Sequence, residues 1–377
     1  MKFDTFMMER WQSMWENQVD LNLSDSGISP LNLRELIEGE GLESLLDTRL
    51  VYTQTNGTTE LRERIASMYP GAEVGNVEVT NGGSEANLLA ALTLVQTGDE
   101  VIGQLPNYMQ LWGVFQALGA KTKPWVLKPD LDAGCWHDRL EDLEEMVTPK
   151  TRMIALCNPN NPSGHVLDSD ELDRIAEIAD RVGAWVLVDE IYQGMEISGE
   201  QTPTMWGRYD KVIVTNSLSK SYGLPGLRIG WILGPERTVE ECWRTHDYTT
   251  IAMGTLSDHL ACRVLEPSRR ERIMSRTRAI LERNLPIALD HASKTRSLKS
   301  ILPEAGGFLM LSYEEAVNSS ELAERLRTEK SLLVVPGDHF GMDGWIRIGF
   351  GDKTDEIEEG LKRVDEVLAD WDGKKCS

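Results

Sequence analysis

Short apolar runs alternate along the chain with segments in which apolar residues recur every three or four positions. Five such runs predict buried strands, at residues 77–80, 100–103, 153–157, 185–188 and 212–215. The segments between them, for example residues 88–95, have the spacing of helices that pack on a core. Strands that alternate with helices are typical of a mostly parallel sheet covered on both faces. We therefore expect an α/β fold.

The N-terminal segment has a helical pattern of its own. Residues 1–20 place large apolar side chains three or four positions apart, which predicts an amphipathic helix. Glu9 and Glu16 fall on the polar side of that helix. The apolar stripe indicates packing on the rest of the protein, whereas the two glutamates are candidates for contact with a ligand.

The C-terminal third predicts a second, smaller unit. A long helical pattern begins near residue 257, is interrupted at Pro267 and continues to about residue 294. Strand patterns follow near 306–311 and 345–350. We predict three parts, an N-terminal arm at 1–35, a large domain at 36–270 and a small C-terminal αβ domain at 271–377.

Composition excludes several classes of partner. The 377 residues carry a formal net charge of −22, and nucleic acids and anionic membranes both require a positive surface. No run reaches the 18 or so apolar residues of a membrane span, and the N-terminus lacks the apolar region of a signal peptide. The five cysteines are widely spaced, without a CxxC pair, so we predict no disulfide framework, no metal site and a cytoplasmic location.

Polar and glycine residues follow directly after the predicted strands. They occur at residues 82–84, 108, 161, 189–192 and 217–220. In an open parallel sheet the carboxyl ends of the strands form one crevice, and ligands bind there. The sequence therefore predicts a single site to which all these residues contribute.

The glycine turn at residues 81–84 predicts an anion-binding site. It joins the strand 77–80 to a helix, and the first N–H groups of a helix are unpaired and lie at the positive end of its dipole. A phosphate fits beside Gly83 and Ser84. The turn is neither a Walker loop nor a GxGxxG motif, so it does not indicate a nucleotide. The alternative is an ordinary strand-to-helix turn in which Ser84 caps the helix.

Three basic residues stand out near glycines or apolar neighbours. Lys220 follows the strand 212–215 and precedes Arg228 by eight positions, which offers an amine nucleophile and an anion clamp on one irregular segment. The alternative is a pair of solvated cations beside a turn. Arg347 stands in an apolar strand, where an unpaired guanidinium is costly, so it is expected to bind a carboxylate.

These motifs resemble a known family. Residues 217–220, reading SLSK, followed by Arg228 and by Gly230-Trp231, are similar to the lysine signature of class I/II aminotransferases, the fold-type I enzymes that use pyridoxal 5′-phosphate (PLP). The segment 158–164, reading NPNNPSG, strengthens the resemblance. It implies a large domain with a mostly parallel, seven-stranded type of sheet, a Schiff base between Lys220 and PLP, and a phosphate held by Ser217 and Arg228 beside Gly83 and Ser84.

The resemblance also implies roles for residues around the cofactor ring. Tyr108 would stack on the ring, and Asp189 would pair with its protonated nitrogen, which lets the ring accept electrons. Asn161 and Tyr192 would bind the ring oxygen, and Tyr192 would also help to set the Schiff-base pKa.

Further implied roles concern the substrate and the partner subunit. Arg347 would bind the α-carboxylate of the substrate beside Asn161, and Gly27 would let the backbone approach that carboxylate. Tyr52 would reach across a homodimer to the phosphate of the neighbouring subunit, and the segment 243–250 would also face the neighbour's site. We therefore expect a homodimer with shared active sites.

Two reactions remain open from the sequence. The first is an aminotransferase that moves an amino group from an L-amino acid to a 2-oxo acid. The second is a lyase or cyclase, since the segments 25–36, 221–231 and 246–250 resemble the capreomycidine-synthase branch, whose enzymes cyclise a hydroxyarginine. The acidic candidates for binding such a cationic substrate are Glu9, Asp25 and Asp247, the last of which could also be a solvated loop residue.

Overall fold

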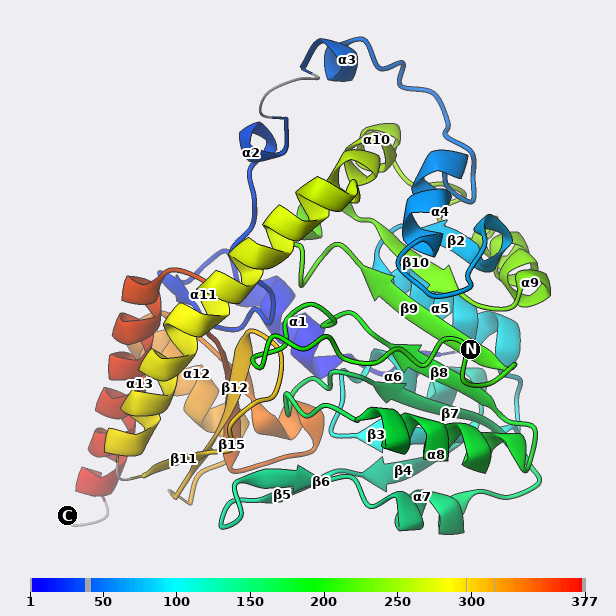
Figure 1. Cartoon of the computed structure of the whole chain (residues 1–377). Coiled ribbons are helices and arrows are strands. Elements are labelled where there is room, and N and C mark those ends of the chain that lie inside the picture. Colours follow the sequence, from blue (N-terminus) through cyan, green and yellow to red (C-terminus); the bar gives the residue numbers. More distant parts are fainter. Residues whose placement is uncertain (1, 38–41, 296, 315, 375–377) are drawn as a thin grey trace.

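The computed structural model describes residues 2–37, 42–295, 297–314 and 316–374 (Figure 1). Its largest element is a seven-stranded sheet with the strand order β2-β10-β9-β8-β7-β3-β4. The strands are β2 (Val77–Thr80), β3 (Glu100–Leu105), β4 (Lys121–Val126), β7 (Thr151–Cys157), β8 (Trp185–Asp189), β9 (Val212–Ser217) and β10 (Gly230–Leu233). Strand β10 runs antiparallel to both neighbours, and the other neighbouring pairs are parallel. The predicted mostly parallel sheet is confirmed.

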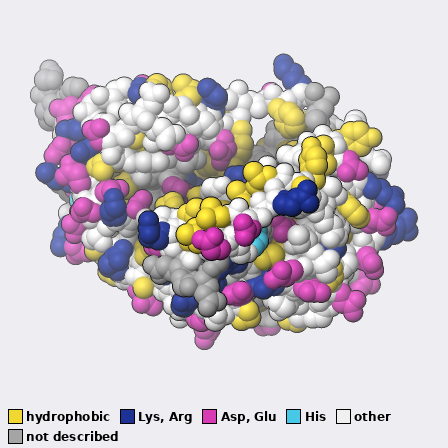
Figure 2. All heavy atoms as spheres, turned by 90° about the horizontal axis from the view of Figure 1, so that it is seen from above, with side chains coloured by type: hydrophobic (Ala, Val, Ile, Leu, Met, Phe, Trp, Pro, Cys, Tyr) yellow, Lys and Arg dark blue, Asp and Glu magenta, His cyan; other side chains and the backbone are white. Residues whose placement is uncertain are grey.

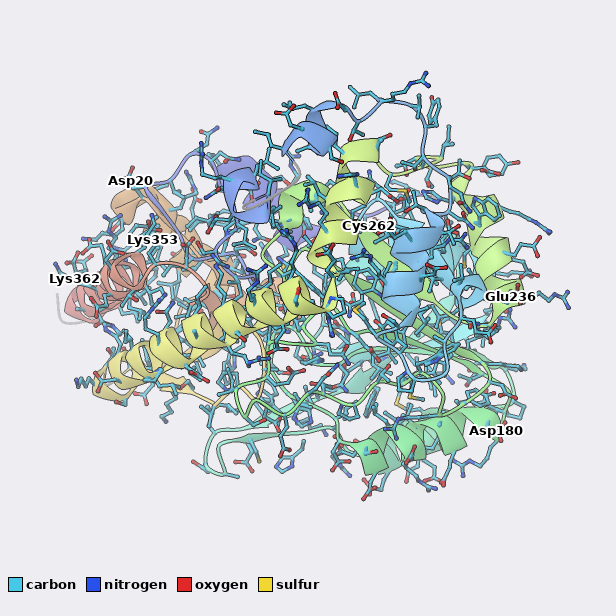
Figure 3. All side chains as sticks on the ribbon, turned by 45° about the horizontal axis from the view of Figure 1, so that its top comes forward. Asp20, Asp180, Glu236, Cys262, Lys353 and Lys362 are labelled. Carbon is cyan, nitrogen blue, oxygen red and sulfur yellow. The ribbon has the colours of Figure 1, made fainter. Side chains whose placement is uncertain are left out.

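Helices cover both faces of this sheet because successive residues of its buried strands point to opposite sides. In β8, Leu187 packs in one core with α5, α6 and α9, whereas Val186 and Val188 pack in another core with α4, α7, α8 and α10. Cys262 of α10 lies near α4 (Figure 3), with its Sγ 3.7 Å from the Thr58 hydroxyl. The helices are α4 (Thr59–Ala66), α5 (Gly83–Leu94), α6 (Gln110–Leu118), α7 (Leu140–Met146), α8 (Ser169–Asp180), α9 (Glu236–His246) and α10 (Thr255–Val264).

A smaller sheet of four antiparallel strands forms the C-terminal unit, with the order β11-β12-β15-β14. Its elements are β11 (Leu298–Ser300), β12 (Phe308–Tyr313), β14 (Val335–Pro336), β15 (Trp345–Gly349), α12 (Ser319–Lys330) and α13 (Thr354–Lys374), and a separate hairpin joins β5 (Lys128–Asp130) to β6 (Cys135–His137). Helix α11 (Pro267–Lys294) connects the units, since Met274 packs in the large core and Leu281 in the small one. It begins at Pro267, where the sequence predicts the break.

The N-terminal arm packs on the C-terminal unit. Its helix α1 (Met7–Trp15) is confirmed, and the indole N–H of Trp11 donates a hydrogen bond of 2.9 Å to the carbonyl of Val334. The following strand β1 (Leu21–Asn22) pairs in parallel with β13 (Leu332–Leu333). These contacts join the arm to the C-terminal unit. The domain boundaries at residues 35 and 270 stay predictions.

One surface exposes a run of large apolar side chains. Helices α2 (Leu33–Ile37) and α3 (Leu42–Leu46) lie apart from the large sheet, at the top of Figure 1. Their exposed apolar residues and those that follow are Leu33, Leu42, Leu46, Leu50, Val51 and Tyr52. Figure 2 views the molecule from this side and shows hydrophobic side chains at the surface among charged ones. The segment has the composition of a surface that packs on another protein.

Two predicted absences concern membranes and metals. Within the described ranges no helix combines the length and the apolar composition that a bilayer crossing requires. The same part of the chain brings together no group of three histidine, cysteine or acidic side chains that could hold a metal ion. The four cysteines at positions 135, 157, 242 and 262 are free thiols, and Cys376 lies outside the described residues.

Candidate active site

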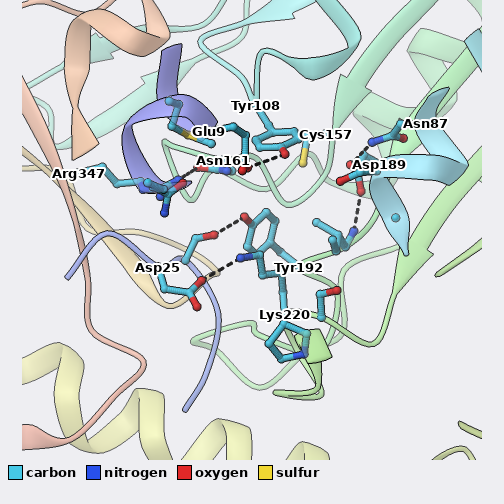
Figure 4. Close-up of a pocket in the computed structure, with 18 of the residues that line it drawn as sticks. Glu9, Asp25, Asn87, Tyr108, Cys157, Asn161, Asp189, Tyr192, Lys220 and Arg347 are labelled. Carbon is cyan, nitrogen blue, oxygen red and sulfur yellow. Dashed lines mark hydrogen bonds and ion pairs between the residues drawn. The ribbon is translucent and has the colours of Figure 1, made fainter. Parts of the chain in front are cut away.

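A cavity of about 390 Å³ opens at the carboxyl ends of β3, β7, β8 and β9, between the glycine turn and the arm helix α1 (Figure 4). Most of the residues predicted for the site line it, namely Glu9, Asp25, Gly83, Ser84, Tyr108, Asn161, Asp189, Tyr192, Lys220, Arg228 and Arg347. They come from segments far apart in the sequence. The sheet brings them together because parallel strands end at one edge.

Lys220 lines this cavity and is held by an acidic residue of the arm segment. Its Nζ donates a hydrogen bond of 2.9 Å to Asp25 Oδ1. Burial alone would lower the pKa of Lys220, but the Asp25 carboxylate and the Tyr192 ring outweigh burial and raise it. The same pairing holds the pKa of the Asp25 carboxyl well below its usual range. The pairing therefore favours the protonated form of Lys220.

Tyr192 and Gly27 lie next to the lysine. The Tyr192 hydroxyl shares a hydrogen bond of 2.8 Å with Ser26, and burial raises its pKa to about 12. Gly27 does not line the cavity, yet a Cβ placed there would come within 3.3 Å of Lys220 Cδ. A larger side chain at position 27 would crowd the lysine.

Asp189 is a buried carboxylate at the end of β8. It accepts hydrogen bonds from Asn87 Nδ2 at 2.8 Å and from the Ile191 N–H at 3.1 Å. Burial raises the pKa of this carboxyl to about 6. Within the described residues no cationic side chain forms an ion pair with it. The carboxylate therefore points into the cavity without a counter-charge.

The anion site is built from the glycine turn and Arg228. Gly82 has a φ of 92° and lies against the Arg228 guanidinium, with which a Cβ at position 82 would collide. Arg228 makes hydrogen bonds of 3.1 to 3.5 Å with the carbonyls of Pro225 and Asn81 and with the Ser219 hydroxyl. No carboxylate of the described residues pairs with it. The guanidinium and the first N–H groups of α5 thus remain available to an anion.

Ser217 lies behind this site and not on the cavity wall. It is fully buried at the end of β9, and its Oγ accepts a hydrogen bond of 3.1 Å from the Ser219 N–H. A Cβ on Gly83 would touch its Cβ at 3.4 Å, so the serine lies directly beside the glycine turn.

Arg347 is 1% exposed and also lacks an acidic partner within the described part of the chain. Its Nη1 donates to Asn161 Oδ1 at 2.7 Å, its Nη2 donates to the Ser24 carbonyl at 2.6 Å, and its Nε has no partner. Burial lowers the pKa of this guanidinium. The group is fixed by two neutral acceptors and keeps its charge for a bound anion.

The arm closes the cavity with the polar face of α1. Glu9, Gln12, Ser13 and Glu16 all line the cavity, at the spacing of one side of a helix. The Tyr108 hydroxyl donates a hydrogen bond of 2.7 Å to Glu9 Oε1. Burial raises the pKa of the Glu16 carboxyl, and the nearby carboxylates of the arm segment raise it further. Carboxylates thus outnumber cations on this side of the cavity.

Sequence reasoning missed five polar or thiol residues of the cavity wall: Gln12, Ser13, Ser26, Asn87 and Cys157. Helical spacing from Glu9 and Glu16 could have revealed the first two. Asn87 lies one turn after Gly83 on α5, so the same periodicity marks it. Ser26 and Cys157 carry no such signal.

Besides Gly27 and Ser217, two more predicted residues lie outside the cavity of this chain. Tyr52 is 82% exposed, and Asp247 is exposed directly after α9. His246 beside it is fully buried, with its ring nitrogens near Glu78 and Glu85, so it does not face a substrate. The roles of Tyr52 and Asp247 across a subunit boundary stay predictions.

The family follows from a comparison with known proteins. Residues 21–364 match the family model of aminotransferase class I and II, a range that covers both sheets and the cavity residues from Asp25 onward. The chain belongs to this family. The solved structure of a PLP-dependent aminotransferase from Streptococcus suis superposes with a TM-score of 0.92, at 32% identity, over 98% of this chain and 99% of that one.

Relatives with different reactions resemble this aminotransferase-family chain. Capreomycidine synthase of Streptomyces vinaceus is 30% identical over 369 residues, which cover 96% of this chain and 93% of that protein. The arginine–pyruvate transaminase of Pseudomonas aeruginosa is 26% identical over 333 residues, covering 86% and 84%. The PLP-dependent cyclase OrfR has the same fold, with a TM-score of 0.85 at 24% identity over 98% of both chains.

PLP is the cofactor of this aminotransferase-family protein, and the cavity fits it. The unpaired Arg228 and the start of α5 suit the phosphate, and the lone buried Asp189 suits a protonated ring nitrogen. Lys220 lines the same cavity. Each charged end of the cofactor thus finds a group of opposite charge.

Proposed function

We propose that the protein is a PLP-dependent aminotransferase that transfers the amino group of an L-amino acid to a 2-oxo acid. The observation that supports this most is the meeting of Lys220, Asp189 and the unpaired guanidinium of Arg347 in one cavity of about 390 Å³. An amine base, an acid for the ring nitrogen and a clamp for a carboxylate are the groups that amino transfer from an amino acid requires.

The same proposal assigns the cofactor contacts. Arg228, Gly83, Ser84 and Ser217 would hold the phosphate, and Asp189 would hold the ring nitrogen. Asn161 and Tyr192 would bind the ring oxygen, and Tyr108 would stack on the ring. Lys220 would hold the cofactor covalently. When bound, PLP supplies an electron-withdrawing ring that makes the α-hydrogen of an amino acid acidic.

The chain's own residues position the substrate and move its proton. Arg347 would bind the α-carboxylate, replacing none of its bonds to Asn161 and Ser24 because its Nε is free. Lys220 Nζ would accept the α-proton, which requires a neutral amine. Asp25, at 2.9 Å, favours the charged form of that amine. A substrate cation that pairs with Asp25 would weaken this effect and promote proton transfer.

The test is a half-reaction without any 2-oxo acid. The purified PLP form is mixed with basic, neutral and acidic L-amino acids, including a γ-hydroxylated arginine, and the spectrum and product masses are followed. We expect one equivalent of 2-oxo acid per subunit, with conversion of the cofactor to its pyridoxamine form. Repeated loss of water or another small group, with PLP intact, would contradict the aminotransferase proposal.

That contrary result would support a second candidate, a lyase or cyclase acting on an amino acid with a cationic side chain. Two observations favour it: the similarity to capreomycidine synthase, and the carboxylates of Glu9, Glu16 and Asp25 on the arm side of the cavity. Carboxylates recognise guanidinium groups through paired, charge-assisted hydrogen bonds. A cationic substrate suits either reaction, since the arginine–pyruvate transaminase is a relative too.

We also propose a homodimer in which each subunit completes the site of the other. The exposed apolar residues of α2 and α3 supply a contact surface, and the 82% exposure of Tyr52 leaves its ring available to a partner's phosphate site. Asp247 would face the partner's substrate from the neighbouring exposed loop. Light scattering on the active protein should give twice the chain mass, and an active monomer would contradict the proposal.

A further inference from the structure

A buried charge cluster adjoins the glycine turn, outside the cavity and unused by the proposed chemistry. It consists of Glu78 on β2, Glu85 in the first turn of α5 and His246, the last residue of α9, and we call it the His246 cluster. Glu78 and His246 are 0% exposed, and Glu85 is 8% exposed. Charged side chains are rarely buried this deeply unless they are paired, as these are.

Each nitrogen of the imidazole ring faces a carboxylate. Nδ1 lies 2.8 Å from Glu78 Oε1, and Nε2 lies 3.2 Å from Glu85 Oε2 and 3.0 Å from the Thr250 hydroxyl. Burial alone would lower the pKa of His246, but the two carboxylates raise it to about 9. The ring is therefore a cation at neutral pH, with both N–H groups directed at acceptors.

Glu85 connects this cation to the anion site. Its Oε2 accepts a hydrogen bond of 2.6 Å from the N–H of Asn81, the first residue of the glycine turn. Its Oε1 accepts bonds from the hydroxyls of Thr249 and Thr250 at 2.6 and 2.9 Å. The Glu85 carboxylate thus fixes the turn. Its negative charge also opposes the binding of a phosphate beside Ser84, the residue that precedes it.

His246 is the one cation of the described residues that forms an ion pair with Glu85. Glu78 is also acted on by a second cation, Arg62 of α4, which lowers its pKa, although burial keeps that pKa raised at about 7. Removal of the imidazole charge would therefore leave Glu85 uncompensated, behind the turn that the phosphate must approach.

We propose that His246 is a positioning residue for the cofactor phosphate. It holds the Glu85 carboxylate against the Asn81 N–H and offsets the negative charge of Glu85, so that the turn 81–84 accepts a dianion. This inference rests on the phosphate site of the proposed function. It assigns no contact between His246 and the cofactor. The expected signature is a loss of affinity that depends on the phosphate group alone.

The test compares the binding of PLP with that of pyridoxal, which lacks the phosphate, to the cofactor-free protein. In His246→Gln, the Kd of PLP should rise about tenfold or more, because a buried carboxylate loses its charged partner. The Kd of pyridoxal should change by less than about twofold. The matched control is His291→Gln on α11, which removes a histidine 2.9 Å from Asp365, and neither Kd should change. Equal losses for both ligands, or no loss for PLP, would overturn the proposal.

If His246→Gln does not fold, the wild-type protein provides the test. The PLP-to-pyridoxal affinity ratio should fall as pH rises through about 9, where His246 loses its proton. Two carboxyl groups face the imidazole: Glu85, which is ionised well below this range, and Glu78, with a pKa of about 7. Glu78 in turn lies near Arg62 and near the Cys242 thiol, which has a pKa of about 12. A ratio that stays constant from pH 8 to about 10 would overturn the proposal.

Arg228→Met separates this inference from the proposed phosphate site. Arg228→Met should raise the Kd of PLP about tenfold or more, with pyridoxal unaffected, because it removes the direct anion clamp. Retention of the full PLP preference in that variant would mean that the phosphate binds elsewhere and that the proposed cofactor contacts are wrong. If only Arg228→Met loses the preference, the phosphate site stands and the role of His246 is wrong.

Discussion

Two buried charges in the cavity have no counter-charge among the described residues, the guanidinium of Arg347 and the carboxylate of Asp189. A buried charge without a partner of opposite charge costs several kcal/mol of folding stability, because neutral hydrogen-bond partners only partly offset the loss of water. Such positions are typical of sites in which the ligand supplies the opposite charge. The two side chains thus indicate what the ligand must carry, an anion near Arg347 and a cation near Asp189.

At the residue scale, Arg347→Lys tests the substrate clamp. A lysine keeps the charge but cannot form two parallel hydrogen bonds with a carboxylate while also bonding Asn161 and Ser24. We expect kcat/KM for the amino acid to fall roughly ten- to hundredfold, as for the loss of a charged hydrogen bond. Steady-state kinetics measure this, and the Kd of PLP is the internal control. An unchanged kcat/KM would show that the carboxylate binds elsewhere.

At the scale of elements, one side of the arm helix α1 packs on the protein and the opposite side lines the cavity. Met8 is buried, and Trp11 bonds to the Val334 carbonyl, so the apolar side fastens the helix. The opposite side presents Glu9 and Glu16 to the cavity. The arm therefore supplies the variable wall of the site, while the strand ends supply the groups that hold the cofactor.

The charge of that helix face predicts substrate preference. The Glu16 side chain forms no hydrogen bond or ion pair within the described residues, and only its backbone N–H bonds to the Gln12 carbonyl, so Glu16→Gln removes a charge without breaking a structural contact. The variant should lower kcat/KM about tenfold for amino acids with a cationic side chain and leave neutral ones unchanged. Asp20→Asn is the control, since Asp20 belongs to the same arm but does not line the cavity. Equal effects on cationic and neutral substrates would contradict this preference.

Five of the seven strands of the large sheet, and helices such as α5, could be predicted because apolar runs and helical spacing are local properties of the sequence. The strand ends then indicated the cavity residues from Gly83 to Lys220. Strands β4 and β10 could not be predicted, and the antiparallel direction of β10 has no local signal, since the run Gly230–Leu233 looks alike in either direction. Contacts such as Tyr108 with Glu9, or His246 with Glu78, join residues about a hundred or more positions apart, and spacing carries no signal for them.

At the scale of the whole molecule, one buried and one half-buried histidine join distant parts of the chain. His246 joins α9 to β2, and His165 lies 2.7 Å from Glu304 and 3.4 Å from Asp138. For both histidines burial acts to lower the pKa, but carboxylates outweigh it and raise the pKa from 6.5 to about 9. Their charged form is thus favoured by the folded state and not by the unfolded chain.

The resulting pH dependence can be given a sign. Because the folded pKa values lie above the unfolded ones, the stabilisation is complete below pH 6.5 and is lost as the pH rises through about 9. The free energy of unfolding should fall by roughly 2 kcal/mol or more across that window. Urea denaturation at several pH values measures it, and the double variant H165Q/H246Q should show a smaller fall. A constant or rising stability would contradict the assigned pKa shifts.

The central claim is that Lys220, in this cavity, holds the cofactor of an amino acid-transforming enzyme. The most direct measurement is reduction of the PLP-loaded protein with borohydride, followed by digestion and peptide mass spectrometry. We expect the cofactor mass on the peptide that contains Lys220, and none on the corresponding peptide of Lys220→Ala. A cofactor found on another lysine, or an unlabelled Lys220 in an active protein, would contradict the account.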